Sequence, residues 1–246
     1  MKNQEITKNI VESLYTGIIH RFDEIEKFLN EAEMMVKDYE ESKIRGYDAE
    51  LDKLASSPNY DEMHDEIMEK KYWYQYTFPE HLWFSILTYQ YSFFDSTINR
   101  IYRLYCRMNN LTTPKNYLDV FKTIKNLSMK LGKDLMPENS EVCKNLSMLR
   151  IIRNSIAHSG SAQLKNYIET GNETNDKHDV SYLLIPGNKY LAIERLSLAI
   201  EFVAKNKKII KMESDFTLHF GKPFCTYTNQ LFRQELINIY NSAFVV

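Results

Sequence analysis

The sequence predicts an all-α protein with a long N-terminal helix and a small β-hairpin, and three observations favour this class. Gly and Pro occur only 7 and 6 times in 246 residues, whereas a fold of many short strands needs frequent turn residues. Apolar residues recur at spacings of three and four over most of the chain, the period of an amphipathic helix. The hydrophobic content of 43% is enough for a substantial core. We expect residues 1–246 to form a single domain, because no repeat or low-complexity linker divides them.

The first expected element is a long amphipathic helix at the N-terminus. Glu and Lys separate its apolar positions, which recur every three or four residues: Ile6, Ile10, Leu14, Ile18, Phe22, Ile25, Leu29, Ala32 and Val36. In the segment that follows, Gly46 and Pro58 are expected to break the chain into one or two shorter, more exposed helices.

A second long helix is expected over the middle of the chain. The stretch Thr77-Phe-Pro-Glu80 resembles a capping box, which predicts a helix beginning at Thr77. Asn109-Asn110 and then Pro114 supply stop signals, so the helix is expected to run to about Met108. Because this segment is apolar over most of its circumference, we expect it to be central in the fold.

Asp95 is unusual within this expected helix, because it directly follows Phe93-Phe94. An ionised carboxylate among apolar side chains is costly unless it is paired. The same helix has a less apolar side, marked by Ser92, Ser96 and Asn99. The sequence leaves open whether Asp95 faces that side or requires a buried partner.

The remaining elements are shorter. A helix is predicted over residues 116–132, ending at Gly132, and Pro137 is expected to open the next helix, which ends before Gly160. Residues 180–193 are typical of a β-hairpin with a turn at Pro186-Gly187-Asn188. Helical spacing then returns over two segments, residues 194–212 and 230–244.

Charge, cysteines and the N-terminus exclude several classes of protein. The formal net charge of −2 provides no general attraction to nucleic acid, so any polyanion site requires a local cluster of Lys and Arg. Cys106, Cys143 and Cys225 are widely spaced, which favours free core thiols in a reducing compartment over disulfides or a thiolate zinc site. The chain has no signal-peptide pattern and no long apolar span, so we expect a soluble cytoplasmic protein without membrane contact.

No cofactor or metal is expected from the motifs. The chain lacks the glycine-rich phosphate loops of nucleotide-binding proteins and the serine elbow of hydrolases. Its six histidines form neither H-x-x-x-H nor H-E-x-x-H, the spacings that place two ligands on one helix face.

Arg153 has an unexpected position in the helix expected after Pro137. It falls close to the centre of the apolar stripe of that helix, which comprises Val142, Leu146, Leu149, Ile152 and Ile156. A guanidinium cannot lose its proton, so a buried one needs a carboxylate or a polar cavity. Asp95 is the candidate partner.

His158 lies five residues later, at the end of the same helix. Asn154 is one turn before it, where the amide can hydrogen-bond to the imidazole and orient it. A histidine is the usual side chain for moving a proton near neutral pH. On one helix Arg153 and His158 point about 140° apart, so two copies of the helix, related by a two-fold axis, are needed to aim both at one cleft.

The stretch Arg153-Asn154-Ser155-Ile156-Ala157-His158 resembles the R-x4-6-H motif of the HEPN superfamily (higher eukaryote and prokaryote nucleotide-binding), with the polar residue that often follows its Arg. The likeness covers about residues 80–160 and implies an antiparallel helical bundle. It further implies a metal-independent endoribonuclease that acts as a homodimer, often in toxin–antitoxin or anti-phage systems with an antitoxin or another defence partner. Toxins of this superfamily that pair with nucleotidyltransferase antitoxins usually carry a Tyr two residues after the His, whereas this chain has Gly160.

By position, this resemblance implies that Arg153 and His158 are catalytic, that Asn154 orients them and that Asp95 is the acidic residue of the preceding long helix. RNA supplies its own nucleophile, the 2′-OH, so such a site needs only a proton-transfer group and a cation. Four further arginines are candidates for RNA binding: Arg150, Arg100, Arg103 and Arg107. Two alternatives remain open, a related module that binds RNA or a partner without cleavage, and a helical dimerisation domain in which Arg153 is a structural ion pair.

Overall fold

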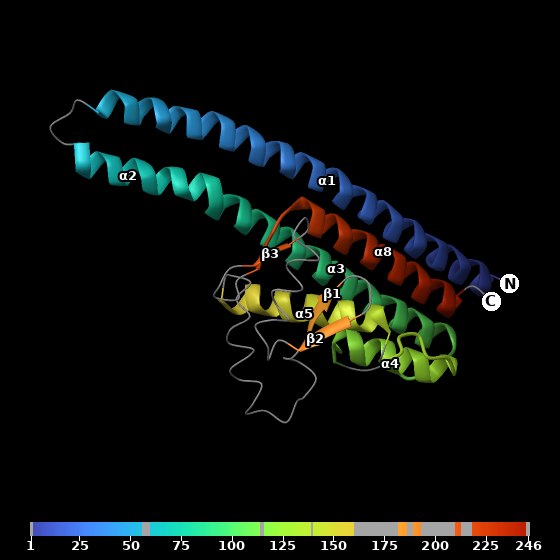
Figure 1. Cartoon of the computed structure of the whole chain (residues 1–246). Helices are drawn as coiled ribbons and strands as arrows, with labels where there is room; N and C mark the ends of the chain where they lie inside the picture. Colours follow the sequence, from blue (N-terminus) through green and yellow to red (C-terminus); the bar gives the residue numbers. More distant parts are fainter. Residues whose placement is uncertain are drawn as a thin grey trace.

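Long helices dominate the fold, which confirms the prediction of a mostly helical protein (Figure 1). The computed structural model describes residues 2–55, 60–113, 116–138, 140–159, 182–185, 189–192, 210–212 and 218–244. The helices are α1 (Lys2–Leu54), α2 (Tyr60–Tyr72), a π-helical turn η1 (Trp73–Thr77), α3 (Phe78–Met108), α4 (Val120–Leu131), α5 (Glu141–Ser159) and α8 (Lys222–Phe244). None of these described helices is both long and apolar enough to pass through a lipid bilayer.

Helix α1 runs unbroken for 53 residues, so the predicted break at Gly46 is wrong. A single glycine inside a helix costs only about 1 kcal/mol relative to alanine. Contacts with α2 and η1 directly after this position hold the helix in place. Lys71 lies 2.6 Å from the Asp48 carboxylate, and the rings of Tyr47 and Tyr74 are 6.0 Å apart. Pro58, the other expected break, lies outside the described residues.

Helix α3 begins at Phe78, directly after Thr77 as predicted, but the capping box expected there is wrong. Thr77 has helical angles, φ −69° and ψ −46°, and its side chain forms no capping hydrogen bond. The π-helical turn joins α2 to α3 without interruption, with the amide of Phe78 donating to the carbonyl of Trp73. Aromatic packing on α1 favours this continuation, since Tyr39 stacks on Tyr74 at 6.1 Å and contacts Phe78 at 5.4 Å.

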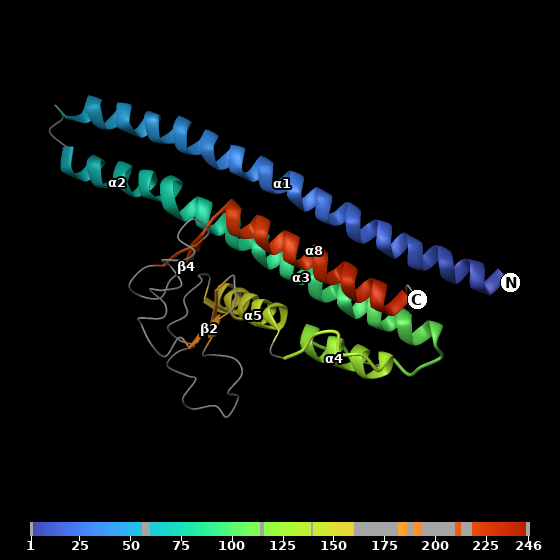
Figure 2. The ribbon, with the colours of Figure 1, turned by 45° about the vertical axis from the view of Figure 1, so that its right-hand side comes forward.

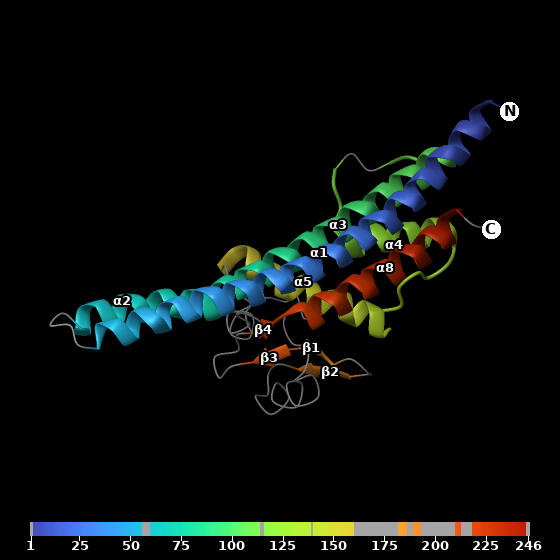
Figure 3. The same ribbon diagram turned by 90° about the horizontal axis from the view of Figure 1, so that it is seen from above.

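Helix α3 is the central element, as its apolar circumference predicts. Helices α1 and α8 pack along one side of it, whereas α4 and α5 lie on the other side (Figures 1 and 2). Seen from above, α1, α3 and α8 run lengthwise beside one another (Figure 3). The most deeply buried side chains come from all of these layers and include Phe22, Phe94, Ile101, Leu127, Leu146 and Phe232.

The ends of α3, α4 and α5 follow from local signals. Helix α3 ends at Met108 as predicted, where Asn110 adopts a left-handed φ of 53°. Helix α4 ends before Gly132, also as predicted, because Gly132 takes a φ of 63° that favours glycine. Both α4 and α5 begin about four residues later than predicted, at the N-caps Asp119 and Ser140, whose side-chain oxygens accept backbone N–H bonds.

Four short strands complete the described chain. Strand β1 (Tyr182–Ile185) pairs antiparallel with β2 (Lys189–Ala192), with Ile185 opposite Lys189, and the expected turn at 186–188 lies outside the described residues. Strand β3 (Ile210–Met212) pairs with β4 (Leu218–Phe220). The end of the helix predicted over 194–212 is therefore a strand, and its earlier part lies outside the described residues.

The final helix, α8, begins at Lys222, eight residues before the predicted start at Gln230. Its additional first turns carry Phe224 and Cys225, which are both buried. Among the described residues, no disulfide joins Cys106, Cys143 or Cys225. Cys106 and Cys225 lie in the core, whereas Cys143 is half-buried.

Candidate active site

Asp95 is half-buried on α3, on the side that faces the loop before α4. Its Oδ1 lies 3.4 Å from the amide nitrogen of Asn99, one turn further along the helix. Burial raises the pKa of Asp95 above its usual value, whereas a hydrogen bond from the Tyr117 hydroxyl acts in the opposite direction. The carboxylate of Asp119 adds to the rise, and the cation of Arg153 opposes it.

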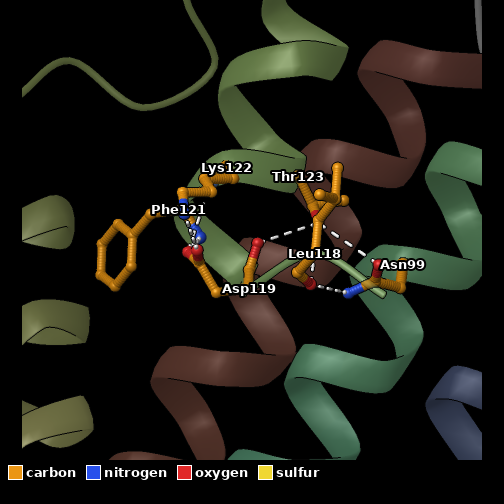
Figure 4. A network of polar contacts seen from close by, with 6 residues as sticks. All are labelled: Asn99, Leu118, Asp119, Phe121, Lys122 and Thr123. Atoms are coloured by element: carbon orange, nitrogen blue, oxygen red, sulfur yellow. Dashed lines mark hydrogen bonds and ion pairs between the residues drawn. The ribbon is translucent and has the colours of Figure 1, made fainter. Parts of the chain in front are cut away.

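A network of polar contacts fixes the loop that carries Tyr117 (Figure 4). Asn99 donates to the carbonyl of Leu118 over 2.9 Å, and the hydroxyl of Thr123 lies 3.4 Å from the side-chain oxygen of Asn99. Asp119 then caps α4 by accepting from the amides of Phe121 and Lys122 at 3.0 and 3.1 Å. The loop is thus tied to α3 beside Asp95, which places Tyr117 there.

Arg153 lies on the side of α5 that faces α3, where it is half-buried. Its Nη1 donates to the Asn154 side-chain oxygen over 2.9 Å, and its guanidinium carbon lies 5.6 Å from the centroid of the Tyr91 ring. The Nε of Arg153 is buried and has no hydrogen-bond partner among the described residues. Among the described residues, no ion pair joins Arg153 to Asp95. The two charges therefore interact only at longer range.

Tyr91 contacts Arg153 and lies one helical turn before Asp95 on α3. It is only 3% exposed, and its hydroxyl forms no hydrogen bond within the described part of the chain. Burial raises the pKa of Tyr91, the cations of Arg150 and Arg153 oppose the rise, and the Asp95 carboxylate reinforces it. Where Tyr91 of α3 meets Arg153 of α5, the Tyr91 hydroxyl and Arg153 Nε are therefore buried polar atoms that lack, among the described residues, the hydrogen-bond partners such atoms normally have.

His158 belongs to the last turn of α5, which ends at Ser159, next to the Gly160 that predicted the stop. Its side chain and Gly160 lie outside the described residues, so the expected contact between Asn154 and His158 stays a prediction. The Asn154 side-chain oxygen accepts from Arg153. The structure therefore links Asn154 to the arginine of the motif.

Three of the four candidate RNA-binding arginines line one groove, of about 410 Å³, which we call the arginine groove. Arg100, Arg103 and Arg107 line it from α3, and Tyr117 and Asn99 also border it. Ile10, Leu14 and Leu104 supply its apolar lining. Arg150 does not line this groove, because its guanidinium lies 4.9 Å from the Phe121 ring on α4.

Two residues of this region, Tyr91 and Tyr117, were not predicted from the sequence. Tyr91 stands one helical turn before Asp95, so an i, i+4 search along α3 would have found it. Tyr117 lies in a loop, where no periodic pattern marks a position, and only the Asn99 network places it beside Asp95.

The assembled region offers cations, a half-buried carboxylate and two tyrosines, a chemistry suited to an anionic ligand. Among the described residues, no group of three His, Cys, Asp or Glu side chains gathers as metal ligands would. No protein-family model, curated protein or solved structure matches the chain.

Proposed function

We propose that the protein is a metal-independent endoribonuclease of the HEPN type, with an active site formed where two α5 helices meet in a homodimer. The observation that carries this proposal is the state of Arg153. Its guanidinium is held at the α3 interface by Asn154 and Tyr91, has no carboxylate partner among the described residues, and stands five residues before His158. A cation held in this way is available to an anionic substrate.

The chemistry requires few groups. His158 takes the proton of the RNA 2′-OH, whose oxygen attacks the adjacent phosphorus, and the bond from phosphorus to the 5′-oxygen breaks. The leaving oxygen takes up a proton, so the products carry a 2′,3′-cyclic phosphate and a 5′-OH. Arg153 stabilises the charge that develops on the phosphoryl oxygens. No metal is needed for these steps, because the nucleophile belongs to the substrate.

The other predicted residues take supporting roles in this proposal. Asn154 positions the Arg153 guanidinium through its 2.9 Å hydrogen bond. Asp95 is too far from Arg153 for an ion pair, so we assign it to the electrostatics of the site rather than to direct pairing. A role in a toxin–antitoxin or anti-phage system, with a neutralising partner protein, follows from the resemblance of the motif alone.

A second candidate function is an RNA-binding module that does not cleave. The arginine groove favours it, since this feature does not depend on the Arg153–His158 motif. The third alternative, Arg153 as a structural ion pair, is less favoured because no carboxylate pairs with Arg153 in the described residues.

An RNA-cleavage assay in a buffer containing a chelator tests the proposal. We expect wild-type protein to yield fragments ending in a 2′,3′-cyclic phosphate, and Arg153→Ala and His158→Ala to abolish cleavage while the protein stays folded and dimeric. Arg21→Ala serves as the matched control, because Arg21 is exposed on α1 and pairs with Glu24 at 2.9 Å. Undiminished cleavage by both motif variants, or none by wild type on a panel of RNAs, would contradict the enzyme assignment.

A further inference from the structure

The three arginines of the arginine groove differ from other arginines of the helical body. Arg21, Arg45 and Arg233 each contact a carboxylate, at 2.9, 3.0 and 2.9 Å respectively. In the described part of the chain, neither Arg100, Arg103 nor Arg107 forms an ion pair, and no acidic side chain lines their groove. Three unpaired guanidinium groups around one concave surface repel one another and favour a bound anion with several charges.

The spacing of these arginines suits a chain of phosphates. They recur at intervals of three and four residues, so they lie along one face of α3. The helical rise places Arg100 and Arg107 about 10.5 Å apart along the axis, with Arg103 between them. A single phosphate cannot contact both ends of this row, whereas a strand with a phosphate on every nucleotide can follow it.

Tyr117 adds an aromatic surface at the border of the groove. Its side chain is 57% exposed, although the loop that carries it is tied to α3 through Asn99 and Leu118. Partial burial, reinforced by the interaction of its hydroxyl with the Asp95 carboxylate, raises the pKa of Tyr117 to about 12. The loop therefore positions the ring beside α3, while much of the surface of the ring is open to solvent.

We propose that the arginine groove binds single-stranded RNA, with consecutive phosphates on Arg100, Arg103 and Arg107 and a base stacked on the ring of Tyr117. This inference rests on the proposed function and specifies the form of its substrate. An unpaired base can leave the strand to stack on an aromatic ring, whereas the bases of a duplex are already stacked and paired. The volume of about 410 Å³ also admits a nucleotide more readily than a double helix.

The groove adjoins the candidate active site through residues that neighbour Asp95. Asn99 and Tyr117 border the groove; Asn99 donates to Asp95 Oδ1 over 3.4 Å, and Tyr117 lies close enough to Asp95 to affect the pKa of that carboxyl. Asp95 and Arg153 in turn act on the same buried Tyr91 from α3 and α5. A strand lying along Arg107, Arg103 and Arg100 is therefore directed past Tyr117 towards Arg153.

Binding is measured by fluorescence anisotropy on the cleavage-silent variant His158→Ala. The probes are a labelled short oligouridine and a blunt RNA duplex of the same length, each titrated over a range of KCl concentrations. We expect the single strand to bind at least tenfold more tightly than the duplex. Arg103→Ala should weaken its binding and reduce the slope of log affinity against log salt by about 0.7, the value for one phosphate contact on a single strand.

Two substitutions at Tyr117 separate stacking from the hydroxyl contact. Tyr117→Ala should weaken oligouridine binding about tenfold, whereas Tyr117→Phe should retain most of the affinity because it keeps the ring. Arg21→Ala, an ion-paired arginine on α1, should leave the affinity unchanged. Circular dichroism spectra and unfolding midpoints establish that each variant is folded.

Equal affinity for the duplex, or no effect of Arg103→Ala and Tyr117→Ala on folded protein, would overturn the inference. If wild type cleaves RNA but these binding results are negative, the nuclease proposal stands and RNA binds at a surface other than the arginine groove. If the single strand binds as expected but wild type does not cleave RNA, the proposed binding site is supported and the proposed endoribonuclease activity is contradicted.

Discussion

The guanidinium carbon of Arg153 lies 5.6 Å from the centroid of the Tyr91 ring, and this contact joins α5 to the central helix α3. A guanidinium over a tyrosine face contributes about 0.5–2 kcal/mol, depending on how far the pair is removed from water. It lets a half-buried arginine pack at an apolar interface without a carboxylate. Helix α5 is thereby anchored through Arg153, one of the proposed catalytic residues.

Tyr91→Phe tests whether the tyrosine contributes through its ring or through its hydroxyl. The substitution keeps the ring under Arg153 and removes a buried hydroxyl without a hydrogen-bond partner among the described residues. We expect the free energy of unfolding in urea to stay the same or to rise by about 1 kcal/mol, because that desolvation cost is lost. Tyr91→Leu, which removes the ring, should lower it by about 2 kcal/mol. A loss of stability in the phenylalanine variant would show that the hydroxyl has a partner.

Asp95→Asn should change how stability depends on pH. Burial raises the folded-state pKa of Asp95, so the folded protein holds this proton more tightly than the unfolded chain does. Wild type should therefore lose stability relative to Asp95→Asn as pH rises from below the usual aspartate pKa through the raised value. Urea unfolding of both proteins across this range measures the difference. Asp65→Asn, which alters an exposed side chain of α2, controls for the loss of one charge. If wild type instead gained stability relative to Asp95→Asn as pH rises, the pKa of Asp95 would be lowered by folding rather than raised.

Two glycines should respond in opposite ways to alanine. A Cβ at Gly46 meets no atom within 4 Å and the position lies inside α1, so Gly46→Ala should raise the free energy of unfolding by about 0.5–1 kcal/mol. Gly132 has a φ of 63° at the end of α4, so Gly132→Ala should lower it by about 1 kcal/mol. Thermal or urea unfolding of the pair measures both effects, and a destabilised Gly46→Ala variant would indicate that α1 bends or is covered at this residue.

Asp119 should stabilise both α4 and the loop that carries Tyr117. Its carboxylate accepts from the amides of Phe121 and Lys122, so Asp119→Ala should lower the free energy of unfolding by about 1 kcal/mol. Asp119→Asn keeps a hydrogen-bond acceptor at this position and should lower the free energy of unfolding by only a few tenths of a kcal/mol. Hydrogen exchange at the first amides of α4 should increase in the alanine variant alone. Equal exchange in both variants would mean that the cap does not hold this turn.

Local signals predicted some boundaries well and failed where distant packing decides. Helix α3 ends at Met108 and helix α4 ends at Leu131, because Asn110 and Gly132 just beyond them adopt a left-handed φ, which a short stretch of sequence predicts. Thr77 and Gly46 carry equally clear local signals, yet the helices continue through both because aromatic and ionic contacts between α1 and α2–α3 favour continuation. Such contacts join residues far apart in the chain and have no local pattern.

In the candidate site, too, the sequence predicted what local periodicity determines and missed what distant contacts determine. Helical periodicity placed Arg153 on a packed face of α5, where the structure also has it. The expected Asp95 partner was inferred only from its chemistry, and the two side chains form no ion pair in the described residues. The arginine groove draws on α1, α3 and the Tyr117 loop together, so one-dimensional spacing could indicate its arginines but not Tyr117.

The proposed composite site predicts the outcome of mixing two inactive subunits. If each active site takes Arg153 from one subunit and His158 from the other, a heterodimer of Arg153→Ala and His158→Ala contains one intact pair and one doubly altered pair. Random assembly of equal amounts makes half of the dimers mixed, each with one of two sites intact, so RNA cleavage should return to about a quarter of the wild-type rate. The mixture is prepared by co-expression, and each variant alone provides the baseline. If each site instead uses Arg153 and His158 of the same chain, no mixture restores cleavage, because every subunit lacks one of the two groups.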